Sequence, residues 1–204
     1  DEIRLDLNEN LFLPEKYYNS ILGELNIDIS IYPSEYGAPL CNKLADHYNL
    51  VPERFMIANG SDMVLDTIFK SVVPEKGTLG YFVPSYSYYD FFARRNNLKV
   101  IEIPLNNDFS VPSSTSYLDE LDTLVLCSPN NPTGLEVDRN HIESILNHDL
   151  TLIIDEAYVE YCEQNCLNLL NKYSNLILIR TFSKAWGLAG VRVGYAISSP
   201  EKIM

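Results

Sequence analysis

The sequence predicts an α/β fold: one three-layer domain with a mostly parallel sheet of about seven strands and helices on both faces. Short apolar runs bounded by turn residues alternate with segments of helical periodicity through most of the chain. Apolar runs of this kind are typical of parallel strands that are covered on both faces. The alternation therefore indicates βαβ units.

Seven runs are expected to form the strands, at residues 55–58, 78–83, 100–105, 123–127, 151–154, 176–180 and 191–197. Helical periodicity between several of them predicts helices over residues 61–73, 86–96 and 137–147. Parallel strands need crossover connections, which such helices supply.

The two ends of the chain differ from this pattern. Residues 1–37 contain scattered Pro, Asn and Tyr around one expected helix at 15–25, and we interpret them as an N-terminal arm before a domain over 38–204. Tyr32 and Tyr36 make the arm aromatic, which favours packing against a partner surface. Residues 198–201 begin a further helix, so we expect the domain to be incomplete at its C-terminal end.

Composition excludes several classes of protein. Hydrophobic residues make up 46% and charged residues 21%, which is typical of a globular chain. The net charge of −13 argues against nucleic-acid and anionic-membrane partners, which bind basic patches. No apolar run approaches the roughly 18 residues that cross a bilayer, and no basic segment precedes an apolar one at the start. We therefore expect a soluble, cytoplasmic protein.

The four cysteines indicate neither disulfides nor a metal site. They are irregularly spaced, and the chain is large enough to form a core without covalent links. Cys162 and Cys166 are four apart, but none of the three histidines lies at a ligand spacing from them. We expect free thiols and no bound metal.

Three polar motifs follow predicted strands, where open α/β sheets bind ligands. Asn59-Gly60-Ser61-Asp62 opens a helix whose unpaired N–H groups could bind an anion, although helix capping alone would also explain Ser61 and Asp62. Pro84-Ser85-Tyr86 offers an aromatic face to a planar ligand, and a half-buried helix residue is the alternative. In the stretch 128–134, two prolines and Gly134 fix a turn in which Asn131 could donate to a ligand, or simply form the turn.

A fourth motif joins Asp155, Tyr158 and Lys184. Asp155 follows a buried strand, where a carboxylate is costly unless a positive group meets it. Lys184 lies between the apolar residues Phe182 and Trp186. A structural salt bridge would explain either residue alone.

Together these motifs meet the requirements of pyridoxal 5′-phosphate (PLP). Its pyridine nitrogen needs a carboxylate, its aldehyde needs an amine of lowered pKa, and its phosphate needs helix-end amides, hydroxyls and an arginine. At these positions the chain resembles the fold-type I PLP-dependent aminotransferases, and most closely the histidinol-phosphate aminotransferase family. The resemblance runs through Leu7 to Asn10, Tyr32-Pro33, the motifs above, Asp155 to Tyr158, and Arg180 to Gly194.

The resemblance implies a role for each matching residue. Lys184 would hold the cofactor as a Schiff base and later move a proton between substrate and cofactor, while Asp155 would pair with the pyridine nitrogen. Asn131 and Tyr158 would hydrogen-bond the cofactor 3′ oxygen, and Tyr86 would stack on the ring. The residues implied in phosphate binding are Gly60, Ser61, Asp62, Thr181, Ser183 and Arg192.

The resemblance also implies partners and a reaction. Tyr32 would reach the cofactor and substrate of the partner subunit in a homodimer, and Asn8 and Asn131 would border the substrate. The expected reaction moves an amino group from a phosphorylated amine, with histidinol phosphate the best candidate, to a 2-oxo acid such as 2-oxoglutarate. A threonine-phosphate-type decarboxylase and a catalytically silent PLP-binding fragment are the alternatives, the latter because the family's small C-terminal domain is absent from this chain.

Overall fold

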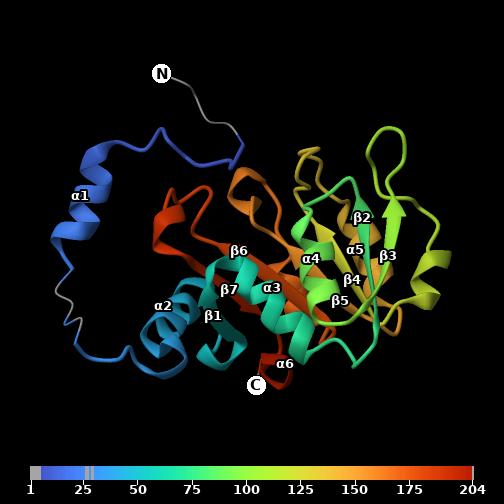
Figure 1. The fold of residues 1–204 in the computed structure, drawn as a ribbon, viewed down its shortest axis with the longest axis horizontal. Coiled ribbons are helices and arrows are strands. Elements are labelled where there is room, and N and C mark those ends of the chain that lie inside the picture. The colour runs from blue at the N-terminus through green and yellow to red at the C-terminus, as the bar shows by residue number, and fades with distance from the viewer. Residues whose placement is uncertain (1–5, 26–27, 29, 204) are drawn as a thin grey trace.

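A seven-stranded sheet forms the centre of the computed structural model, which describes residues 6–25, 28 and 30–203 (Figure 1). The strand order is β1-β7-β6-β5-β4-β2-β3. Strands β6, β5, β4, β2 and β3 are parallel, whereas β7 is antiparallel to both of its neighbours. The predicted mostly parallel sheet is confirmed. The strands are β1 (Phe55–Asn59), β2 (Thr78–Val83), β3 (Lys99–Pro104), β4 (Thr123–Cys127), β5 (Thr151–Asp155), β6 (Leu176–Thr181) and β7 (Val193–Ile197).

The largest error in the predicted strands is at the start of β7, which we placed at Val191. Ala189–Val191 instead forms a short 3-10 helix. Arg192 then adopts a left-handed backbone with φ of 56°, which interrupts extended structure. Strands β5 and β6 run one residue further than predicted, so that Asp155 and Thr181 are their last residues.

Helices cover both faces of the sheet, which confirms the three layers (Figure 1). On one face, α3 (Gly60–Ser71), α4 (Tyr88–Arg95) and α6 (Pro200–Ile203) pack against the sheet around buried residues such as Leu65 and Phe92. On the other face, α2 (Ala38–Tyr48) and α5 (Arg139–Leu146) enclose a second core, with Leu44 and Ile145 buried. Helix α2 was not predicted from the sequence.

The N-terminal arm passes over the loop that follows β6. Asn10 donates to the carbonyl oxygen of Ala185 at 3.1 Å, and the Tyr17 hydroxyl donates to that of Trp186 at 3.3 Å. The expected arm helix is α1 (Glu15–Gly23), which buries none of its residues in this chain.

The helix predicted to begin within residues 198–201 is α6, and Met204 lies outside the described residues. Among the residues that the structure describes, no helix combines the length and apolar character that a bilayer span requires.

Candidate active site

The predicted motifs meet at one edge of the sheet because β1, β4, β5 and β6 all end there. β7 is antiparallel to β1 and β6, so the carboxyl ends of those two strands point the same way. β4 and β5 are parallel to β6, so the turn that starts at Ser128 after β4 and Asp155 at the end of β5 lie at the same edge. The edge thus gathers residues that are far apart in the chain, from Gly60 to Asp155 and on to Lys184.

Asp155 is a buried carboxylate with two protein donors. It is 4% exposed, and its Oδ1 accepts the backbone N–H of Ala157 at 3.0 Å. Its Oδ2 accepts the hydroxyl of Tyr89 at 2.8 Å. Burial raises the pKa of the Asp155 carboxyl from 3.8 to about 6, although the two hydrogen bonds act in the opposite direction. The carboxylate therefore favours any ligand that brings a positive charge to it.

Lys184 is a half-buried amine in the loop after β6. Its Nζ donates to the carbonyl oxygen of Leu7 in the arm at 2.7 Å and lies 5.6 Å from the centre of the Tyr158 ring. Burial lowers the pKa of the Lys184 amine, and the carboxylates of Asp62 and Asp155 oppose this shift only in part. A lowered pKa increases the fraction of neutral, nucleophilic amine.

Tyr158, Asn131 and Asn8 line one cavity of about 280 Å³, and the Tyr158 ring also lies near the Lys184 amine. The Asn8 side chain donates to the Tyr158 hydroxyl at 2.9 Å, so an arm residue and a residue after β5 are joined across 150 positions. Burial raises the pKa of the Tyr158 phenol, which stays protonated at neutral pH. The cavity thus offers amide and hydroxyl donors.

The start of α3, called the cradle below, is the place where the sequence predicts anion binding. Gly60 has φ of 79°, and a Cβ there would lie 2.5 Å from a guanidinium nitrogen of Arg192. A Cβ on Gly194 would collide with the backbone N–H of Ser61, so β7 passes close against the start of α3. Arg192 reaches Asp62 at 3.6 Å. Backbone N–H groups and an arginine at one helix start are a typical phosphate site.

Thr181 and Ser183 are joined to each other in the loop that carries Lys184. The Thr181 hydroxyl lies 3.0 Å from that of Ser183 and accepts the Ser183 backbone N–H at 3.1 Å. The Thr181 hydroxyl donates to Ser183, which holds the loop against the end of β6, and the Ser183 hydroxyl can still donate to a ligand.

Tyr86 contacts both the cradle and the carboxylate region. Its hydroxyl donates to Asp62 at 2.9 Å, and its ring lies edge-on to that of Tyr89 with centres 5.5 Å apart. Tyr89 was not predicted as a contact of Asp155, because its position inside a helix suggested only core packing. Tyr32 is not brought to this site within the chain: it is 96% exposed, in the segment that precedes α2.

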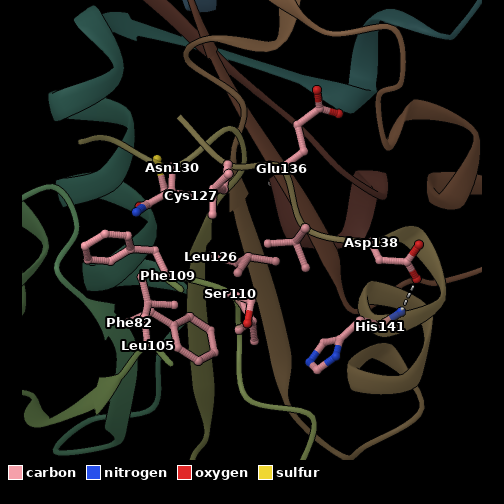
Figure 2. Close-up of a pocket in the computed structure, with 13 residues that line it drawn as sticks. Phe82, Leu105, Phe109, Ser110, Leu126, Cys127, Asn130, Glu136, Asp138 and His141 are labelled. Atoms are coloured by element: carbon pink, nitrogen blue, oxygen red, sulfur yellow. Dashed lines mark hydrogen bonds between the residues drawn. The ribbon is translucent and has the colours of Figure 1, made fainter. Parts of the chain in front are cut away.

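A second cavity, of about 240 Å³, lies beyond the ends of β2 and β4 (Figure 2). Its lining is mostly apolar, and it includes neither Lys184 nor Asp155. Figure 2 shows the Asp138 carboxylate turned to the start of α5, where it accepts the backbone N–H of His141 at 3.3 Å. The pKa of the His141 imidazole is lowered by burial, which keeps the ring neutral.

The four cysteines are free thiols, as predicted. Within the ranges that the structure describes, no group of three or more His, Cys, Asp or Glu side chains is arranged to hold a metal ion.

Comparisons with known proteins agree with this architecture. The family model for aminotransferases of class I and II matches residues 2–204. A histidinol-phosphate aminotransferase from Lactococcus lactis subsp. cremoris (strain SK11) is 36% identical over 208 residues, covering 100% of this chain and 58% of the relative. The chain therefore spans little more than half the length of that relative.

Solved structures are similar in fold. A putative histidinol-phosphate aminotransferase from Erwinia carotovora atroseptica has a TM-score of 0.88 at 25% identity, covering 98% of this chain and 62% of that one. A histidinol-phosphate aminotransferase from Sinorhizobium meliloti, solved in complex with pyridoxal-5′-phosphate, has a TM-score of 0.86 at 26% identity, covering 97% and 56%. The sheet-edge site and the family match together show that the chain belongs to the class I and II aminotransferases.

Proposed function

We propose that this chain is the cofactor-binding part of a PLP-dependent aminotransferase. The observation that carries the proposal is a buried carboxylate, Asp155, at the same sheet edge as the half-buried amine of Lys184, whose pKa is lowered. Relatives named histidinol-phosphate aminotransferase favour histidinol phosphate as the amino donor. We further propose 2-oxoglutarate as the acceptor, the family's usual choice.

The residues at the site fit the three parts of this cofactor. PLP supplies an electron sink that stabilises negative charge on the substrate carbon. The Asp155 carboxylate would pair with the pyridine nitrogen of the cofactor, and the ring of Tyr86 would stack on the pyridine ring. Gly60 has φ of 79°, a backbone conformation that strains any residue with a side chain, as expected of a helix start that admits phosphate oxygens to the backbone.

Lys184 is proposed to act twice. Its neutral amine would hold the cofactor through the aldehyde, with loss of water, and the amine that the substrate sets free would move a proton at the substrate carbon. Asn131 and Tyr158 would hold the oxygen beside that aldehyde through their donors. Ser61, Asp62, Thr181 and Ser183 would complete the phosphate site, through backbone N–H groups or hydroxyls.

We propose that residues 1–37 act as an arm on the domain formed by 38–204. Asn8 already joins the arm to Tyr158 and would border the substrate. Tyr32 is 96% exposed, which fits a side chain that completes the site of a second copy in a homodimer. The net charge of −13 supports an enzyme without nucleic-acid or anionic-membrane partners, and we propose that it is cytoplasmic.

The cofactor proposal is tested by Lys184→Ala. PLP added to the unaltered chain should give an absorbance band near about 420 nm. Borohydride should then fix the cofactor to Lys184, as located by mass spectrometry. Lys202→Ala is a matched control, because burial also lowers the pKa of that lysine, which lies on α6 and bonds Thr151. An unchanged band in Lys184→Ala would refute the assignment.

The substrate proposal is tested by supplying histidinol phosphate with 2-oxoglutarate and, separately, threonine phosphate. Formation of glutamate supports amino transfer. Release of carbon dioxide as the dominant product would favour the decarboxylase. Cofactor binding without turnover of either compound would favour the silent fragment.

A further inference from the structure

The hydroxyl of Tyr89 is the one side-chain donor that the described residues place on Asp155. Tyr89 is 0% exposed and lies in α4, wedged between Tyr81 and Tyr86 with ring centres 6.0 and 5.5 Å away. We propose that Tyr89 is a positioning residue that holds Asp155 ionised and in a fixed plane. The inference rests on the proposed PLP site and deepens it, because it explains how a buried carboxylate stays charged for the ring nitrogen.

The geometry leaves Asp155 able to accept at least one more donor. Its Oδ1 is bonded to Ala157 and its Oδ2 to Tyr89, one donor on each oxygen. A carboxylate offers about four acceptor sites, so lone pairs remain for a ligand N–H. Two donors on different oxygens also prevent rotation of the group. Loss of the Tyr89 hydroxyl would free Oδ2 and leave only the backbone contact.

The electrostatic surroundings of Asp155 also favour this role for Tyr89. Burial disfavours the ionised carboxylate, and the bond from Tyr89 is the largest influence that opposes this effect on the Asp155 pKa. Burial raises the pKa of Tyr89 well above its ordinary value, so its phenol keeps its proton and remains a donor at neutral pH. The other titratable groups around Asp155, from every element packed against it, are Asp62, Tyr86, Cys127, Glu156, Tyr158 and Lys184.

Tyr89→Phe tests the inference, with Tyr81→Phe as its matched control. Tyr81 is also buried, packs against the Tyr89 ring, and donates to a carboxylate away from the site, that of Glu102 at 3.0 Å. Both variants therefore lose one hydroxyl from the same core. Carbon-13 NMR of the aspartate carboxyls should show the Asp155 pKa rising by about one to two units in Tyr89→Phe only, since hydrogen bonds to charged groups have this strength.

The dissociation constant of PLP, measured against pH, gives the functional readout. Below about pH 6, the dissociation constant of PLP should be about tenfold or more higher for Tyr89→Phe than for the unaltered chain, because each unit of pKa shift changes the ionised fraction of Asp155 tenfold. The two dissociation constants should become equal above about pH 9, where Asp155 is ionised in both proteins. If Tyr89→Phe only damaged the fold, its affinity for PLP would stay low at high pH as well. In an Asp155→Asn background the effect of Tyr89→Phe should disappear.

Two outcomes overturn the inference: an Asp155 pKa that does not move, or a loss of affinity equal to that of Tyr81→Phe at every pH. If Tyr89→Phe does not fold, 3-fluorotyrosine at position 89 keeps the shape and strengthens the donor, and it should lower the Asp155 pKa. Failure of the unaltered chain to bind PLP would instead refute the proposed function, and the NMR measurement on Asp155 would still decide the role of Tyr89.

Discussion

Asp155→Asn is predicted to remove a pH-dependent cost to the stability of the cofactor-free chain. The Asp155 carboxyl has a pKa of about 6 in the folded protein against 3.8 in an unfolded chain. Between these values the folded state binds more protons than the unfolded state, so the free energy of unfolding falls as pH rises. The cost is absent below about pH 3 and complete above about pH 7.

The size of the cost follows from the shift of about two pKa units. Each unit corresponds to about 1.4 kcal/mol, so the full cost is about 3 kcal/mol, of which about half develops above about pH 5. The asparagine side chain cannot ionise, so the variant should lack this part of the pH dependence. It also loses an acceptor for Tyr89 or Ala157, which costs about 1–3 kcal/mol at every pH.

Urea unfolding of both proteins at about pH 5 and about pH 7.5 separates the two contributions. The difference in unfolding free energy between variant and unaltered chain should shift by about 1.5 kcal/mol in favour of Asp155→Asn between these pH values. The hydrogen-bond contribution cancels in this comparison because it does not depend on pH. An equal pH dependence in the two proteins would refute the conclusion that Asp155 is held at a raised pKa.

Two further predictions concern residues that support the site. Arg180→Met removes the ion pair of the buried Glu156, which is 1% exposed and lies 2.7 Å from Arg180, and should lower the free energy of unfolding by about 3–5 kcal/mol. Adding Glu156→Gln should recover much of this loss. No recovery would show that the unpaired charge of Glu156 is not the cause. Gly194→Ala drives a methyl group into the backbone at the start of α3 and should cost about 1–3 kcal/mol in urea unfolding. Gly190→Ala, with no atom within 4 Å of the new Cβ, is the control, and equal effects of the two would contradict the close approach.

The strands were predictable from sequence because each is a short apolar run with clear turn residues at its ends. β4 is buried at every position, which is the pattern that predicted a sheet covered on both faces. The start of β7 was not predictable, because Val191 has strand propensity and only the left-handed backbone of Arg192 ends the preceding turn. Helix α2 was missed because its apolar positions follow an arm rich in Pro and Tyr.

Local sequence also indicated candidate site residues such as Lys184 and Asp155, since a lysine among apolar residues and a carboxylate after a buried strand are both costly. It did not identify Tyr89. Helical periodicity marks that residue as part of the core, and nothing local to α4 indicates that its hydroxyl meets a carboxylate 66 positions away.

The sequence by itself thus determined the fold class, the strand ends on which polar residues gather, and the type of each candidate side chain. Only the tertiary structure decided which of them meet: Asn8 with Tyr158, Lys184 with the carbonyl oxygen of Leu7, and Tyr89 with Asp155. The physical reason is that secondary structure follows from neighbours within a few positions, whereas burial, donor contacts and the resulting pKa values depend on groups that strand order brings together from distant parts of the chain.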